Sequence, residues 1–259
     1  MPLQLAFEDL GDGPPVVVLH GLFGSSRNWR GMARALSAEH RVISVDLRNH
    51  GRSPWISSMT YAEMAADVRA LIRGEGLDRP VVIGHSMGGK TAMVLALESP
   101  ESVGQLIVVD IAPVSYADRL TPYVEAMLSL NPRAMADRAD VVRQMLDRIP
   151  DAAAVRFLMQ NLTVRDDHFD WRLNLPIIGA AVPALCGFPP ELAARRFNGP
   201  ATLVTGSLSD YVTPADAAAF AEQFPQAQTV EIDGAGHWVH ADRPAEFLAA
   251  LGLVPALTA

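Results

Sequence analysis

Residues 81–90 read VVIGHSMGGK, and this stretch decides the fold class. Its three β-branched residues predict a short strand, and the residues after Gly88 favour a helix. Ser86 therefore lies in a G-x-S-x-G turn between a strand and a helix, where a hydroxyl can project from the backbone as a nucleophile. Gly84 and Gly88 leave room for the turn because they lack side chains. A glycine-rich turn without chemistry has the same pattern, so the partners of Ser86 must decide between the two interpretations.

The sequence on both sides of this turn alternates between strand and helix patterns. Leu3 to Phe7 alternates weakly and predicts an edge strand, and Thr60 and Glu63 form a capping-box pattern at the start of a helix. Short apolar runs predict strands at residues 16–19, 41–45, 105–109, 201–205 and 228–232, and helical patterns cover residues 28–38, 60–73, 89–99, 214–224 and 244–251. This alternation predicts an α/β fold, with a mostly parallel central sheet and helices on both faces.

The pattern changes between residues 113 and 197. Helical stretches are expected at residues 116–130, 132–148 and 151–160, no convincing strand is present, and prolines interrupt residues 171–190. We therefore expect residues 1–112 and 198–259 to form the α/β core and residues 113–197 to form a helical cap inserted into it. Helices that simply flank the sheet are the alternative.

Composition narrows the class of partner and the compartment. The 259 residues carry a net charge of −8, and Lys90 is the only lysine among scattered arginines, so no basic patch indicates nucleic acid. Cys186 is the single cysteine, which excludes an intramolecular disulfide and fits a reducing compartment. No signal-peptide pattern is seen at the N-terminus, and no run approaches the ~18 apolar residues of a membrane span. We expect a cytoplasmic protein with a small-molecule partner; the oligomeric state stays open.

Polar residues follow the ends of several predicted strands. His20, Asp46, Ser86 and Asp110 each come directly after a strand, and His237 lies in the loop after the last one. In a parallel sheet the carboxyl ends of the strands share one edge, and ligands bind beyond that edge. The sequence therefore predicts a site there. Its histidines and acids lack the spacing of metal ligands, so we expect no metal and no cofactor.

Five motifs carry a resemblance to a known family. The chain resembles the α/β-hydrolase fold superfamily from end to end, and within it is similar to the small bacterial esterases of the YbfF type and the related mitochondrial ABHD-type esterases. The motifs are DLRNHG (46–51), GHSMGGK (84–90), VDIAPV (109–114), WRLN (171–174) and GAGHWVH (234–240). The resemblance implies a serine carboxylic-ester hydrolase that acts on short- to medium-chain acyl esters or thioesters.

The resemblance also implies the roles of individual residues. Ser86 would attack the acyl carbon and form an acyl-enzyme, and His237 would take the proton and return it to the leaving group. The backbone amides of Leu22 and Met87 would form the oxyanion hole. His20 would brace the loop that carries Leu22 and would not itself be catalytic.

Two aspartates compete for the role of the triad acid. The superfamily usually places the acid after the seventh strand, which corresponds to Asp210. The YbfF-like variant places it after the sixth strand, which corresponds to Asp110, with a serine near the usual position, which corresponds to Ser209. Both loops lie at the same sheet edge, so topology does not decide, and the VDIAPV match favours Asp110.

Other functions are compatible with the same residues. A C–C bond hydrolase, a lactonase or a perhydrolase would use the same triad on the same fold. A non-catalytic ligand-binding protein would keep the pocket without turnover, although an intact triad argues against it. Fold alone does not choose among these functions.

Overall fold

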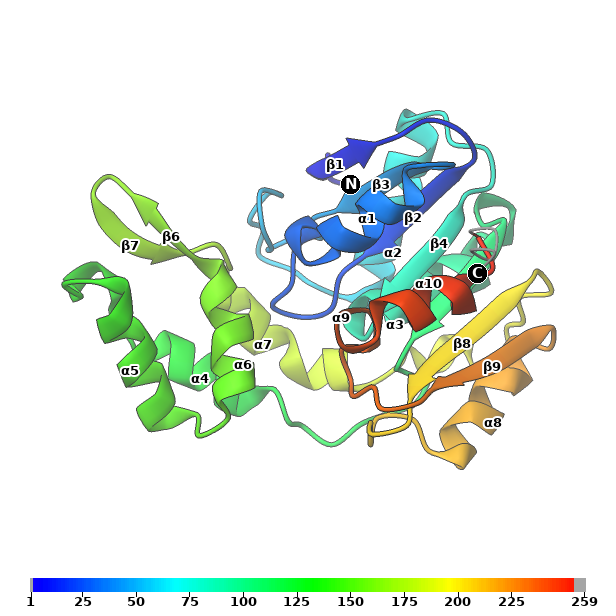
Figure 1. The fold of residues 1–259 in the computed structure, drawn as a ribbon. Coiled ribbons are helices and arrows are strands. Elements are labelled where there is room, and N and C mark those ends of the chain that lie inside the picture. The colour runs from blue at the N-terminus through cyan, green and yellow to red at the C-terminus, as the bar shows by residue number, and fades with distance from the viewer. Residues whose placement is uncertain (1, 254–259) are drawn as a thin grey trace.

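A seven-stranded sheet forms the centre of the computed structural model, which describes residues 2–253 (Figure 1). The strand order is β1-β3-β2-β4-β5-β8-β9, and every neighbouring pair is parallel except β1 with β3. The strands are β1 (Phe7–Leu10), β2 (Pro15–Leu19), β3 (Arg41–Val45), β4 (Val81–His85), β5 (Gln105–Val109), β8 (Ala201–Gly206) and β9 (Ala227–Ile232). The predicted mostly parallel sheet is confirmed, and the edge strand begins at Phe7, where the prediction ended it.

Alternate residues of each strand point to opposite sides of the sheet. Both faces therefore present apolar side chains, and helices cover both. Val17 and Leu19 of β2 belong to one buried cluster, whereas Val16 and Val18 belong to the other. The first cluster includes residues of α2 (Tyr61–Gly74), α3 (Met87–Glu98) and α8 (Pro214–Gln223). The second includes residues of α1 (Arg30–Leu36), α9 (Val239–Asp242) and α10 (Pro244–Leu251). Helices on both faces, as predicted, give the sheet two hydrophobic cores.

The chain between β5 and β8 contains a hairpin as well as helices. Its elements are α4 (Thr121–Leu128), α5 (Arg138–Arg148), α6 (Ala152–Leu158), β6 (Leu162–Arg165), β7 (His168–Trp171) and α7 (Leu175–Cys186). The expectation of no strand was wrong here: β6 and β7 pair antiparallel across Asp166 and Asp167, whose φ angles are 45° and 62°. Two residues with positive φ are typical of a tight hairpin turn.

Helix α7 was also not predicted. Prolines interrupt its sequence, but Pro176 lies in the first turn, where the missing N–H costs nothing. The buried residues of this helix recur at helical spacing and form its inner face: Leu175, Ile178, Val182 and Leu185. The periodicity of these apolar residues therefore outweighs Pro183 in the helix interior.

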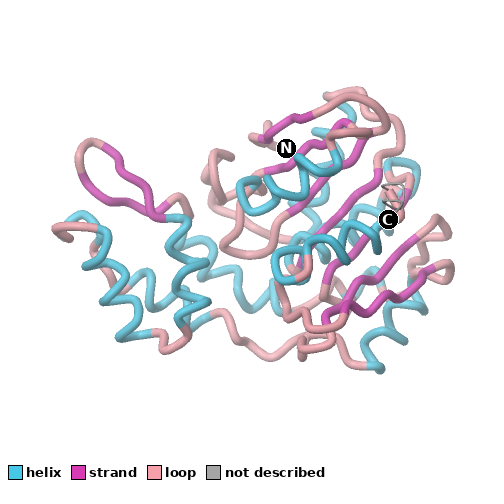
Figure 2. The backbone as a smooth tube through the Cα atoms, viewed as in Figure 1, coloured by secondary structure: helices cyan, strands magenta, loops and turns pink. Residues whose placement is uncertain are grey.

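The segment from α4 to α7 forms a mostly helical group beside the sheet, in which α5 and the β6–β7 hairpin lie on the side away from the sheet (Figures 1 and 2). Hydrogen bonds attach this group to the core. The amide of Asn174 donates to the carbonyl of Asn49 at 3.0 Å, and the hydroxyl of Tyr61 donates to the carbonyl of Leu185 at 2.7 Å. The group therefore stands against the side of the sheet where β3 ends and α2 begins.

One stretch reaches the length and apolar composition of a membrane span. It covers Leu175–Leu192, an 18-residue window that includes α7. The expectation that no run comes near this length was therefore wrong. Within residues 2–253 one face of α7 packs in the first buried cluster, which includes residues of α4, and 28% of the window is buried.

Candidate active site

Ser86 occupies a strained turn between β4 and α3. Its φ and ψ angles are 52° and −118°, a backbone conformation that residues with a side chain rarely adopt. A Cβ atom at Gly84 would collide with the backbone of Gly88, and one at Gly88 would collide with the carbonyls of Leu19 and His20. The Ser86 amide donates to the carbonyl of Val109 at 3.1 Å, which fixes the turn against β5. The two glycines therefore permit a turn that exposes the serine hydroxyl.

His237 lies in the loop between β9 and α9 and points Nδ1 at a buried carboxylate. The distance from Nδ1 to Oδ2 of Asp110 is 2.7 Å, and the Asp110 side chain is fully buried. The imidazole stacks on Tyr211, with 3.7 Å between ring centroids and 15° between the planes. Carboxylate and ring stacking together hold the imidazole in one orientation.

Asp110 directly follows β5 and is held by several donors. Its backbone amide donates to the carbonyl of Val204 at 2.8 Å, and its φ angle is 53°. The hydroxyl of Ser209 donates a short hydrogen bond to Oδ2, and the amide of Gly206 donates to Oδ1 at 3.4 Å. Oδ2 thus accepts from both the Ser209 hydroxyl and the His237 imidazole, and the donors together fix the orientation of the carboxylate.

Asp210 lies apart from this arrangement. Its carboxylate is 72% exposed, and both oxygens accept from Nη1 of Arg119, at 2.8 and 2.7 Å. The structure therefore brings together Asp110 and His237, and it places the competing acid in a surface ion pair.

The backbone amides of Leu22 and Met87 are the two oxyanion donors predicted from the sequence. Leu22 and Met87 both line the cavity that contains Ser86. Among residues 2–253, neither backbone amide has a hydrogen-bond partner, so both stay available to a ligand. Met87 is also the first residue of α3, where helix N–H groups are free and the helix dipole favours negative charge.

His20 supports the loop that carries Leu22. Its Nε2 accepts from the amide of Leu47 at 3.0 Å, and its Nδ1 donates to the carbonyl of Gly21 at 2.8 Å. Burial lowers the pKa of His20, which keeps the ring neutral and allows one nitrogen to accept. This is the bracing contact expected of His20, and it leaves neither nitrogen for catalysis.

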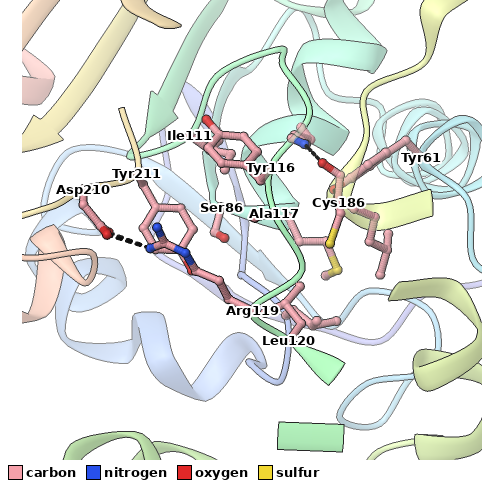
Figure 3. Close-up of a pocket in the computed structure, with 14 residues that line it drawn as sticks. Tyr61, Ser86, Ile111, Tyr116, Ala117, Arg119, Leu120, Cys186, Asp210 and Tyr211 are labelled. Atoms are coloured by element: carbon pink, nitrogen blue, oxygen red, sulfur yellow. Dashed lines mark hydrogen bonds and ion pairs between the residues drawn. The ribbon is translucent and has the colours of Figure 1, made fainter. Parts of the chain in front are cut away.

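Two cavities meet at Ser86. The larger, of about 240 Å³, is lined by His237 and Trp238 of the core and by Phe157 and Leu158 of the inserted segment. The smaller, of about 60 Å³, is shown in Figure 3. In that view Tyr61 and Cys186 lie on one side of Ser86, and Asp210 and Tyr211 lie on the other. A molecule bound at Ser86 can therefore extend in two directions.

Sequence reasoning missed several residues of these cavities. Cys186 is partly exposed and lines the smaller cavity, as does Lys90. Arg119 and Tyr211 line both cavities. Lys90 is the last residue of the GHSMGGK motif and the only lysine of the chain, whereas no quoted motif contains Cys186, Arg119 or Tyr211. Among residues 2–253, no three His, Cys, Asp or Glu side chains are arranged to hold a metal ion.

Comparison with known proteins identifies the class to which this fold and site belong. The model of the alpha/beta hydrolase fold family matches residues 14–244, so the chain belongs to the α/β hydrolases.

Individual relatives narrow the group. The sn-1-specific diacylglycerol lipase ABHD11 of Mus musculus is 38% identical over 263 residues, which cover 96% of this chain and 84% of the mouse protein. Esterase YbfF of Escherichia coli (strain K12) is 34% identical over 92% of this chain and 91% of its own length. A solved marine microorganism esterase superimposes with a TM-score of 0.93 at 35% identity, over 97% of this chain and all of the other. The chain is a hydrolase of the YbfF/ABHD-type group, and its relatives support ester hydrolysis.

Proposed function

We propose that this protein is a serine carboxylic-ester hydrolase that works through an acyl-enzyme on Ser86. The observation that carries the proposal is the 2.7 Å hydrogen bond between His237 Nδ1 and buried Asp110, beside a serine in a strained turn on the wall of the same cavity. Asp110 is the proposed triad acid, because it contacts the imidazole and Asp210 contacts Arg119.

The mechanism follows from these positions. With Nδ1 bound to Asp110, Nε2 of His237 is free to take the Ser86 proton while Oγ attacks the acyl carbon. The amides of Leu22 and Met87 stabilise the resulting oxyanion, and each such donor is worth ~10²–10³ in kcat. His237 then gives its proton to the leaving alcohol, and a water molecule repeats the sequence to release the acid.

The substrate class follows from the cavities and the relatives. Both cavities are lined mostly by apolar side chains, which suits an uncharged ester with acyl and alcohol parts on opposite sides of Ser86. The cavity of about 60 Å³ favours a short- to medium-chain acyl group. One relative is named for a diacylglycerol lipase activity, so a glycerol ester is a reasonable natural substrate, and a thioester with the same acyl group would fit the same chemistry.

Residues 113–197 are the proposed cap over this site. Leu120, Tyr123 and Phe157 come from that segment and line the cavities at Ser86, whereas the nucleophile and the base come from the core. The proposal keeps the division into a core of residues 1–112 and 198–259 and an inserted cap. A cytoplasmic location stays a prediction.

Initial rates with p-nitrophenyl butyrate test the function. The proposal expects saturable turnover by the wild-type protein and its loss in Ser86→Ala, with an unchanged circular-dichroism spectrum. Butyryl-CoA in a parallel assay distinguishes a thioesterase from an esterase. A folded wild-type protein that binds the ester without turnover would favour the ligand-binding alternative.

A further inference from the structure

The only lysine of the chain is buried beside the nucleophile. Lys90 lies one helical turn after Ser86 on α3, its amide donates to the Ser86 carbonyl at 3.0 Å, and the residue is 1% exposed. Its ammonium group donates to three backbone carbonyls, those of Val114 at 2.8 Å, Cys186 at 3.0 Å and Gly187 at 2.6 Å. All three N–H groups of the ammonium therefore have partners.

Backbone carbonyl dipoles and aromatic rings surround this ammonium group. In the part of the chain that the structure describes, no carboxylate forms an ion pair with Lys90. Two of its acceptors lie at the C-terminal end of α7, where free carbonyls carry partial negative charge. The ring of Tyr116 lies 4.7 Å from Nζ, within the range of a cation–π contact. Burying an ammonium is costly, so such a complete set of partners points to a specific task.

The three carbonyls come from the start of the inserted segment and from the end of its last α-helix, α7. Val114 lies just after the segment leaves the core, and Cys186 and Gly187 lie where α7 ends. The amide of Tyr116 donates to the Cys186 carbonyl at 2.9 Å, so the two ends are also bound to each other. One side chain from the nucleophile helix thus links the start of the proposed cap to the end of its last α-helix.

The same end of α7 forms a wall of the smaller cavity. Leu185, Cys186 and Lys90 line it together with Ser86. His237 lines the larger cavity and stacks on Tyr211, which Figure 3 shows on the side of Ser86 away from Cys186. His237 must protonate the leaving alcohol, so the alcohol belongs in the larger cavity. The acyl chain then extends into the smaller cavity, toward Lys90.

We propose that Lys90 is a positioning residue that fixes the end of α7 against the nucleophile helix and thereby limits the length of the acyl chain. Lys90 touches no reacting atom in this scheme. The inference rests on the proposed ester hydrolysis at Ser86 and adds a determinant of acyl specificity to it.

Acyl-chain profiles of Lys90→Met test the inference. Methionine keeps much of the side-chain length but removes the donor that Val114, Cys186 and Gly187 share, and only the Cys186 carbonyl keeps another donor, the Tyr116 amide, so the end of α7 can move away from Ser86. We expect the ratio of kcat/KM for p-nitrophenyl octanoate to that for p-nitrophenyl butyrate to rise about tenfold, the scale on which a pocket discriminates a methylene or two.

Val94→Ala is the matched control. Val94 is buried one turn further along α3 and does not line either cavity at Ser86, so this variant loses stability without altering the pocket. The octanoate-to-butyrate ratio should stay at the wild-type value. An unchanged ratio in Lys90→Met would overturn the role of Lys90, whereas absence of any wild-type turnover would overturn the proposed function.

A measurement on the wild-type protein covers the case in which Lys90→Met does not fold. Labelling with ¹⁵Nζ-lysine gives a single side-chain signal, and at pH 6 we expect it to exchange slowly with water because all three N–H groups are bound. Modification of Ser86 with a hexyl phosphonate should shift this signal more than a methyl phosphonate does. A fast-exchanging signal, or equal shifts from the two chain lengths, would contradict the inference.

Discussion

At the scale of single residues, the choice between two aspartates illustrates what sequence can and cannot specify. Sequence placed Asp110 and Asp210 at the same edge of the sheet and favoured Asp110 through the VDIAPV match, whereas the direction of each side chain is visible only in the structure. Asp110 turns inward from β5 to His237, whereas Asp210 turns outward to Arg119. The contacts of Lys90 could not be predicted for a related reason, because the carbonyls that it binds belong to residues 24 to 97 positions away in the sequence.

This geometry predicts different effects of substituting the two aspartates. We expect Asp110→Asn to lower kcat by ~10⁴, because an amide cannot hold the imidazole in the required tautomer. Asp210→Asn removes an exposed ion pair, which is worth ~0–1 kcal/mol, and kcat should stay within about twofold of wild type. Stopped-flow or steady-state rates with p-nitrophenyl butyrate provide the comparison. The reverse ranking of the two variants would move the triad acid to the loop after β8.

At the scale of elements, strong local signals predicted the structure and weak ones failed. The β-branched runs of the central strands and the elbow at Ser86 lie where the sequence places them. The β6–β7 hairpin was missed because its strands have only four residues each, which is too short for their alternation of apolar and polar residues to stand out. Asp166 and Asp167 between them were the signal that could have revealed it.

The capping box at the N-terminus of α2 gives a prediction at this scale. The side chain of Thr60 accepts from the amide of Glu63 at 3.3 Å, and Glu63 accepts in return from the Thr60 amide at 3.0 Å. Thr60→Ala should lower the free energy of unfolding by about 1 kcal/mol in urea denaturation, because a helix-terminal donor loses its partner. Ser57→Ala, in the same exposed loop, is the control and should leave the midpoint unchanged; an equal loss in both variants would show that the capping box contributes nothing.

At the scale of the whole molecule, folding gathers residues that the sequence scatters. Arg27, Arg52, Arg165 and Arg172 line one surface pocket, although the arginines were expected to remain dispersed. The parallel order of the strands was predictable and brings Ser86 and Asp110 to neighbouring positions after β4 and β5. The cavity shapes were not predictable, because they depend on how the inserted helices pack over the sheet edge.

Buried histidines make the fold sensitive to acid. Burial lowers the pKa of His50 and of His240 to about 3. Between pH 6.5 and about 3 the unfolded chain binds a proton at each of these histidines that the folded chain does not, so stability falls as the pH falls through this window. His240 also stacks on Trp29 at 4.1 Å and has an unpaired buried Nδ1.

His240→Phe should therefore flatten the dependence of stability on pH. Phenylalanine can keep the stack on Trp29 and cannot be protonated, so the slope of the unfolding free energy should decrease by up to ~1.4 kcal/mol per pH unit below pH 6. Urea denaturation at half-unit steps from pH 7 to pH 4 measures the slope. A slope equal to that of the wild type would mean that His240 is already protonated in the folded protein.

The central claim is that a histidine from the loop after β9 activates the hydroxyl of Ser86. Intact-protein mass spectrometry after brief exposure to a fluorophosphonate tests it most directly. The account predicts one adduct, mapped by peptide analysis to Ser86, that forms rapidly in the wild type and at least ~10³-fold more slowly in His237→Ala, in line with loss of a triad member. Equal labelling rates in the two folded proteins, or an adduct on another residue, would contradict it.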